Sequence, residues 1–118
     1  MKKFILVIIC LIMLCGCGSN VAKEYKATYK TISLKETKRL YEEGNTKIVD
    51  VRSESLYEKK HIKGAINIPY KGINNIINMI SKDEIVIIYG ANKKESKSAS
   101  IKVIDMGYSL VYDLGAYK

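Results

Sequence analysis

The stretch that decides the fold runs over residues 84–106 and reads EIVIIYGANKKESKSASIKVIDM. It opens with the apolar run of residues 85–89, whose β-branched content predicts a strand buried on both faces. The run breaks at Gly90, a short polar loop follows over residues 91–95, and helical spacing begins at Ser96. We therefore expect a strand, a tight loop and a helix, with backbone N–H groups that converge at the loop and favour an anion there.

Strands and helices alternate on both sides of this stretch. Outward along the chain the spacing predicts a strand at residues 29–32, a helix opening after Ser33, a strand at 47–51, a loop or short helix at 53–60, a strand at 65–68, a helix at 71–81 and a last strand at 109–113. Such alternation is typical of an α/β fold. We expect a parallel sheet of four or five strands flanked by helices, with residues 85–89 in a central position.

Three of the predicted helices carry specific signals. Ser33 followed by Glu36 forms a capping box, so Ser33 is the expected N-cap of the first helix, and Gly44 ends that helix. Ser96 is the expected N-cap of the last helix. The helix at 71–81 carries four isoleucines at helical spacing, which predicts one buried face made of Ile73, Ile76, Ile77 and Ile80.

Residues 1–16 differ in composition from the rest of the chain. Lys2 and Lys3 precede the apolar run of residues 4–14, which is shorter than the ~20 residues that a helix needs to span a bilayer. A positive start followed by a short apolar run is typical of a secretory signal. The run ends in LCGC at residues 14–17, which resembles the lipobox of bacterial lipoproteins.

The lipobox resemblance implies cleavage after Gly16 and lipid, including palmitate, on the sulfur and the amine of Cys17. Residues 1–16 would then be a signal peptide, residues 17–29 the lipidated cysteine with a polar tether, and residues 30–118 the folded domain. This arrangement predicts a protein anchored to the extracytoplasmic face of a bacterial membrane. An uncleaved membrane anchor and a soluble secreted protein are the alternatives.

The counts of cysteine and histidine restrict the chemistry of the domain. All three cysteines lie at positions 10, 15 and 17, so after cleavage and lipidation the domain keeps no free thiol, disulfide or thiolate metal site. His61 is the only histidine and makes no metal site alone, so we expect neither a metal nor a cofactor. The net charge of +8 is spread as single lysines. Such spreading is typical of a solvated face, with attraction to anionic surfaces as the alternative, and predicts no nucleic-acid partner.

A family resemblance rests on two longer stretches. They are IVDVRSESLYEKKHIKGAINIP at residues 48–69 and IVIIYGANKKESKSASIKVIDMGYSLVYDLGA at residues 85–116. The Asp-Val-Arg after one strand, the His-Ile-x-Gly-Ala before the next and the closing Asp-Leu-Gly together resemble a rhodanese homology domain, over about residues 30–118. The resemblance implies a three-layer fold. In members that work as sulfurtransferases, it also implies a cysteine after the central strand that becomes a persulfide.

The loop after the expected central strand departs from the family pattern. Tyr89 and Ser96 match the family's tyrosine and helix-opening serine. Gly90, however, falls on the cysteine, Lys93 on a usual glycine, and Glu95 on an arginine or threonine. The resemblance therefore implies a loop that keeps its length but has no catalytic residue. Its candidate anion-binding residues are Gly90, Ala91, Asn92, Lys93, Lys94, Glu95 and Ser96.

Asp50, Arg52 and His61 are assigned structural roles. A carboxylate and a guanidinium near a strand end usually satisfy backbone groups of the following loop. A lone histidine in a turn is more often a hydrogen-bonded structural residue than a base or a ligand. The family's usual glutamate partner for the arginine is replaced in this chain, which leaves Glu54 or Glu58 as alternative partners of Arg52.

Two hypotheses from different functional classes follow from these observations. The first is a membrane-anchored, catalytically inactive rhodanese-like module, a pseudoenzyme that binds a small anion or a protein partner. The second is an enzyme, either a thiosulfate sulfurtransferase or another anion-processing enzyme built on the same loop. The glycine at position 90 favours the first, because an amide cradle can bind an anion but cannot form a covalent intermediate.

The anchoring hypothesis predicts that Cys17→Ser releases the protein from the membrane or leaves it unprocessed. Two acyl chains hold a protein firmly because each buried CH₂ adds ~0.8 kcal/mol, and the variant carries none of them. Fractionation of cells and mass spectrometry of the mature N-terminus measure the two outcomes. Cys15→Ala, which changes the neighbouring cysteine, is the control. A mature N-terminus other than a lipid-modified Cys17 would disprove the hypothesis.

Overall fold

The computed structural model describes residues 28–117. These residues form a sheet of five strands in the order β1-β5-β4-β2-β3, and every neighbouring pair is parallel. The strands are β1 (Lys30–Thr31), β2 (Thr46–Asp50), β3 (Ile66–Asn67), β4 (Ile85–Gly90) and β5 (Val111–Ala116). The predicted α/β fold with a parallel sheet is confirmed, and the strand expected at the centre is the middle strand, β4.

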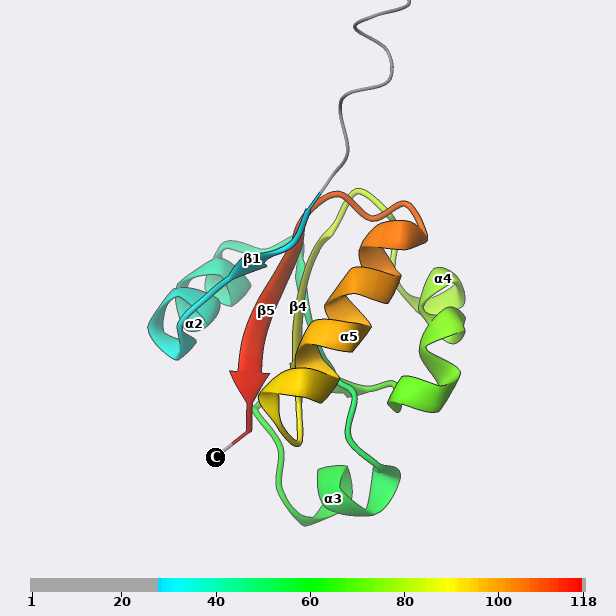
Figure 1. The fold of residues 1–118 in the computed structure, drawn as a ribbon. Coiled ribbons are helices and arrows are strands. Elements are labelled where there is room, and N and C mark those ends of the chain that lie inside the picture. Colours follow the sequence, from blue (N-terminus) through cyan, green and yellow to red (C-terminus); the bar gives the residue numbers. More distant parts are fainter. Residues whose placement is uncertain (1–27, 118) are drawn as a thin grey trace, which may run out of the picture.

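Helices cover both faces of this sheet (Figure 1). They are α2 (Leu34–Glu43), α3 (Glu54–Lys59), the 3₁₀ helix η1 (Tyr70–Asn75), α4 (Ile76–Met79) and α5 (Lys93–Asp105). α5, η1 and α4 lie on one face, and α2 lies on the other (Figure 1). Three layers result, and α3 lies beyond one end of the sheet (Figure 1).

The central strand supplies side chains to both layers because successive residues of a strand point to opposite faces. Val86 and Ile88 belong to the apolar cluster beneath α5, whereas Ile87 and Tyr89 belong to the cluster on the α2 side. All four side chains are fully buried. The continuous apolar run therefore reflects burial on both faces, as the sequence predicts.

The first helix begins as its sequence predicts. Ser33 is the N-cap of α2, and its hydroxyl accepts a hydrogen bond of 3.1 Å from the backbone amide of Glu36. Gly44 ends the helix with a φ of 92°. The carboxylate of Glu36 does not complete the capping box, because it pairs instead with the guanidinium of Arg39 at 2.8 Å.

The last helix begins three residues earlier than predicted. α5 starts at Lys93, and its N-cap is Asn92, whose side-chain oxygen accepts from the amide of Glu95 at 2.8 Å. Ser96 is therefore not the N-cap but a buried residue inside the helix. The loop between β4 and α5 shrinks accordingly to Ala91 and Asn92. An asparagine cap with a glutamate three residues on is as good a start signal as the serine that we favoured.

The prediction of a single helix over 71–81 is wrong in detail. The segment forms η1 followed by α4, with a break in helical angles at Gly72. Because of this change in helix type, Ile77 does not share the face of its neighbours and is 54% exposed. The last strand is also displaced, since β5 begins at Val111 and continues to Ala116.

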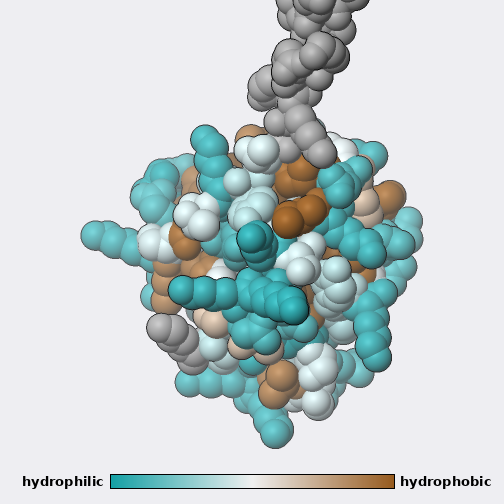
Figure 2. All heavy atoms as spheres, in the orientation of Figure 1, coloured by the Kyte–Doolittle hydropathy of each residue, from teal (hydrophilic) through white to brown (hydrophobic). Residues whose placement is uncertain are grey.

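Two further observations concern the surface and the leader. On the face seen in Figure 2, hydrophobic side chains are scattered among hydrophilic ones and do not gather in one broad patch. Within residues 28–117, no helix has the length and apolar composition needed to cross a membrane. The predicted signal peptide, the Cys17 lipidation site and most of the tether lie outside the described residues.

Tyr108, between α5 and β5, forms a hydrogen bond with the residue that follows α4, and this contact can be tested. The side chain is fully buried, and its hydroxyl donates to the carbonyl oxygen of Ile80 at 2.5 Å. Tyr108→Phe should lower the free energy of unfolding by about 1–3 kcal/mol, because a buried carbonyl loses its donor. Tyr112→Phe is the control, since within residues 28–117 the Tyr112 hydroxyl makes no hydrogen bond. Urea denaturation measures both, and equal midpoints would contradict the assignment.

Candidate functional site

The parallel register brings several candidate residues to one edge of the sheet. Asp50, at the end of β2, is paired with Tyr89 of β4, and Gly90 is paired with Ala116 of β5. The carboxyl ends of these three strands therefore lie side by side. Ligands of open parallel sheets usually bind at this edge.

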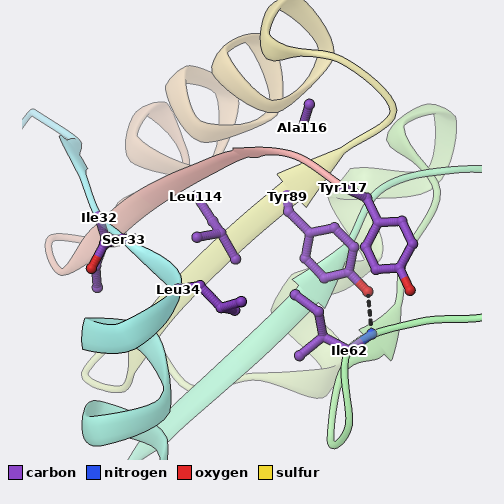
Figure 3. Close-up of a pocket in the computed structure, with 8 residues that line it drawn as sticks. All are labelled: Ile32, Ser33, Leu34, Ile62, Tyr89, Leu114, Ala116 and Tyr117. Carbon is purple, nitrogen blue, oxygen red and sulfur yellow. Dashed lines mark hydrogen bonds between the residues drawn. The ribbon is translucent and has the colours of Figure 1, made fainter.

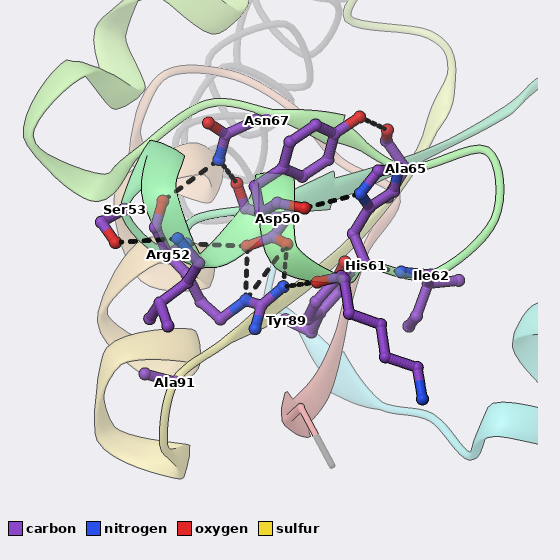
Figure 4. A network of polar contacts seen from close by, with 12 residues as sticks. Asp50, Arg52, Ser53, His61, Ile62, Ala65, Asn67, Tyr89 and Ala91 are labelled. Atoms are coloured by element: carbon purple, nitrogen blue, oxygen red, sulfur yellow. Dashed lines mark hydrogen bonds and ion pairs between the residues drawn. The ribbon is translucent and has the colours of Figure 1, made fainter.

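A buried ion pair stands at the end of β2 (Figure 4). The Nη2 of Arg52 donates to Oδ2 of Asp50 at 2.8 Å, and its Nε lies 3.0 Å from Oδ1. Asp50 is fully buried and Arg52 is 5% exposed. The hydrogen bond with Asp50 raises the pKa of Arg52, although burial alone would lower it.

The same pair also organises the backbone around it. Arg52 donates from Nη2 to the carbonyl oxygen of Lys60 at 2.7 Å, and the amide of Arg52 donates to Asp50 at 2.9 Å. The partner of Arg52 is therefore Asp50, and not Glu54 or Glu58 as we considered. Asn67, which sequence reasoning did not single out, donates its side-chain amide to the carbonyl oxygens of Asp50 and Arg52 (Figure 4). These bonds tie β2, β3 and the α3 segment together.

Two tyrosine rings cover the exposed side of the arginine. The Arg52 guanidinium lies 4.1 Å from the ring centre of Tyr117 and 5.6 Å from that of Tyr89. The Tyr89 hydroxyl accepts a hydrogen bond of 3.1 Å from the amide of Ile62. Burial raises the pKa of Tyr89, so this hydroxyl stays neutral in the physiological range. Tyr117 was missed in the sequence because it follows the last strand without any local motif.

His61 is engaged with a neighbouring residue. Its ring stacks on Tyr57 with 3.7 Å between ring centroids, and its Nδ1 lies 2.7 Å from the carbonyl oxygen of Tyr57. Tyr57 in turn donates its hydroxyl to the carbonyl oxygen of Ala65 at 2.6 Å. Among residues 28–117, His, Cys, Asp and Glu side chains form no group of three that could hold a metal ion. The histidine thus contributes to the turn before β3.

A carboxylate from the first turn of α5 reaches the loop after β4. Oε1 of Glu95 accepts a hydrogen bond of 2.8 Å from the amide of Ala91. A Cβ atom built on Gly90 would lie 2.9 Å from that same oxygen and 3.1 Å from the amide nitrogen of Ser96. Gly90 does not have a positive φ, so its backbone does not require glycine. The side chain of Glu95 therefore occupies the space into which a side chain at position 90 would project.

The remaining loop candidates are divided between the interior and the surface. The Ser96 hydroxyl lies 3.2 Å from the carbonyl oxygen of Ile88 and is hydrogen-bonded to Asp113, so it is held inside the fold. Lys93 and Lys94 are exposed in the first turn of α5. The structure thus brings Gly90, Glu95 and Ser96 together, whereas the side chains of Lys93 and Lys94 lie on the protein surface.

A cavity of about 450 Å³ opens beside this edge, on the α2 side of the sheet (Figure 3). Its lining is mainly apolar and consists of Ile32, Ser33, Leu34, Ile62, Tyr89, Leu114, Ala116 and Tyr117. These residues come from the β1–α2 connection, the turn before β3 and the ends of β4 and β5. No local motif indicates this cavity, because its walls come from four separate segments of the chain.

Comparisons with known proteins place these features in context. The family profile described as a rhodanese-like domain matches residues 33–117. The thiosulfate sulfurtransferase GlpE of Coxiella burnetii is 28% identical over 86 residues, which cover 73% of this chain and 80% of that protein. A solved rhodanese with anions from E. coli is 32% identical, with a TM-score of 0.57 over 60% of this chain and 86% of its own. A rhodanese-like domain from Anabaena has a TM-score of 0.68 at 24% identity, over 75% of this chain and 69% of its own.

The buried pair predicts a large difference between two charge-removing substitutions. Asp50→Asn leaves the Arg52 guanidinium buried without a counter-charge, and we expect it to lower the free energy of unfolding by about 3–5 kcal/mol. Glu36→Gln breaks a solvent-exposed ion pair with Arg39 and should leave stability nearly unchanged. Urea denaturation of both variants provides the measurement. Similarly small effects of the two substitutions would mean that water stabilises the Arg52 charge when Asp50 no longer does.

Proposed function

The chain belongs to the rhodanese-like domain family, and on that premise we propose that it is a non-catalytic member that acts by binding. In this proposal it is anchored through a lipid on Cys17 at the extracytoplasmic face of a bacterial membrane. The observation that carries the proposal is Gly90, which ends the central strand where sulfurtransferases of the family hold their cysteine. We expect the domain to act by binding a ligand or a partner and not by catalysing a reaction.

The loss of a nucleophile supports this proposal most directly. Sulfur transfer through a persulfide requires a thiolate, and the cysteines of this chain are confined to positions 10, 15 and 17. The carboxylate of Glu95 lies beside Gly90 and accepts a hydrogen bond from the amide of Ala91. An incoming anionic sulfur donor would meet a negative charge there and would have to displace it.

Ser96 does not offer a substitute nucleophile. Its hydroxyl is held between the Ile88 carbonyl and Asp113, and its side chain is fully buried. His61, the only histidine, stacks on Tyr57 instead of facing the serine. The sulfurtransferase activity named for the C. burnetii relative is the alternative function, but it would need a thiol that another molecule supplies.

The direction of the sheet determines how an anchored domain would be presented. The chain enters β1 at the amino edge of the parallel sheet, whereas Gly90 and Tyr117 lie at the carboxyl edge (Figure 1). A lipid at Cys17 would therefore hold the opposite edge toward the bilayer. The site and the adjoining cavity would face the extracytoplasmic space, where soluble partners can reach them.

Cyanolysis of thiosulfate tests the loss of activity, with the native protein and three variants compared side by side. The native protein should not exceed background. Gly90→Cys should be weakly active, because the added Cβ crowds Glu95 and the carboxylate raises the pKa of the new thiol. Gly90→Cys combined with Glu95→Arg should be faster by roughly an order of magnitude, the ratio that about 1.4 kcal/mol provides.

Gly90→Ser is the control, because it adds a side chain of similar size without a thiol. Its rate should equal that of the native protein. Clear turnover by the native protein would refute the proposed function. Equal rates for the single and double cysteine variants would show instead that Glu95 does not influence the loop.

A further inference from the structure

Strand β5 is open on one side over its last residues. β1 pairs with β5 only at Tyr112 and Asp113, and the amide of Ile32 adds one bond to the Asp113 carbonyl at 3.0 Å. On its other side β5 is paired with β4 as far as Ala116, with a register shift that leaves Leu114 out of the ladder. Within residues 28–117, the part of β5 beyond Asp113 therefore has a strand on one side only. An unpaired strand edge presents backbone groups that can accept another strand.

The cavity described above lies along this open edge (Figure 3). Leu114, Ala116 and Tyr117 form one wall. Ile32 and Leu34, where the chain passes from β1 into α2, form another. Leu34 is 48% exposed although it faces this space. A strand added to β5 would thus pass beside an apolar cavity that can receive one side chain.

Exposed lysines follow two of the residues that line the cavity, whereas the carboxylate of Glu36, two residues after Leu34, is paired with Arg39. Lys35 follows the lining residue Leu34, and Lys63 follows the lining residue Ile62; both lysines are exposed. The lining itself contains no acidic residue. The carboxylate of Asp113 is engaged by the amide of Gly115 at 2.9 Å and by Ser96. This edge therefore complements a ligand with an apolar centre and acidic flanks.

We propose that the open edge of β5 binds an extended peptide segment of a partner protein, with an apolar side chain in the cavity and acidic residues on either side. The segment would lie in the line of β1, beyond Ile32, and pair with β5 beyond Asp113. This inference deepens the proposed binding function and rests on it. Main-chain hydrogen bonds would supply affinity, while the cavity and the lysines would select the sequence.

The probe is a labelled pentapeptide, acetyl-Glu-Thr-Leu-Thr-Glu-amide. Its binding to the full-length protein is measured by fluorescence anisotropy. In a strand, the leucine and both glutamates share one face. Versions with isoleucine, phenylalanine or methionine at the centre accompany it. We expect saturable binding by at least one of these peptides. Replacing its central residue by aspartate, or its flanking glutamates by lysines, should raise the Kd about tenfold.

Backbone methylation distinguishes strand addition from other modes of binding. Alternate amides of a strand point to the same side, so methylating one alternate set should abolish binding and methylating the other should be tolerated. Equal effects of the two sets would overturn the proposal in favour of a helix or an irregular ligand. Absence of binding tighter than about 1 mM for all four peptides would also overturn it.

Protein variants locate the peptide on the domain. Leu34→Glu should weaken binding about tenfold, whereas Leu110→Glu, which changes a leucine of similar exposure (48% and 42%) outside the cavity, should not. The double variant Lys35→Glu with Lys63→Glu should reverse the preference toward the lysine-flanked peptide. An effect of Leu110→Glu equal to that of Leu34→Glu would overturn the location. Dimers that the peptide cannot dissociate would assign the edge to a second copy of the chain.

The same protein samples are assayed for thiosulfate cyanolysis, so that two failures remain distinguishable. Turnover by the native protein would refute the non-catalytic function whatever the peptide does. Inactive protein that binds no peptide would refute the docking site alone.

Discussion

The buried pair of Asp50 and Arg52 is the interaction on which the functional edge of the sheet depends. Neither charge could remain in the interior alone, because an unpaired ion loses several kcal/mol of hydration there (about 3–5 kcal/mol when one partner is removed). The requirement for full pairing fixes the end of β2 and, through the Lys60 carbonyl, the return of the chain after α3. Asn67 and the rings of Tyr89 and Tyr117 then arrange themselves around the pair.

This dependence explains how the scaffold and the chemistry can be separated. The ion pair, the strand register and the N-cap of α5 make no use of a nucleophile, so a glycine at the end of β4 leaves them intact. The amide of Ala91 nevertheless needs an acceptor, and Glu95 supplies one from within the chain. A carboxylate of the same chain thus satisfies the loop amide without an external anion.

The sequence predicts the sheet well because burial on both faces requires a continuous apolar run, which β4 has. Ser33 was also identified correctly, since capping depends on residues that are close in the sequence. The start of α5 was placed too late because two capping signals compete there, at Asn92 and Ser96, and only packing of Ser96 against Asp113 decides between them. The partner of Arg52 lies only two residues before it, at Asp50. The contribution of Tyr117 and the cavity, in contrast, depend on residues that only the folded sheet brings together.

The two faces of the sheet differ in a way that bears on binding. Beneath α5, thirteen buried residues form one cluster, whereas the cluster on the α2 side has four, surrounded by partly exposed apolar side chains. Among the residues of α2 only Thr37 is buried, so this helix covers its face loosely. Burial of exposed apolar surface by a partner is favourable, and such surface lies on the α2 side next to the last residues of β5. In the proposed function, the α2 side would therefore contribute more to binding than the loop after β4.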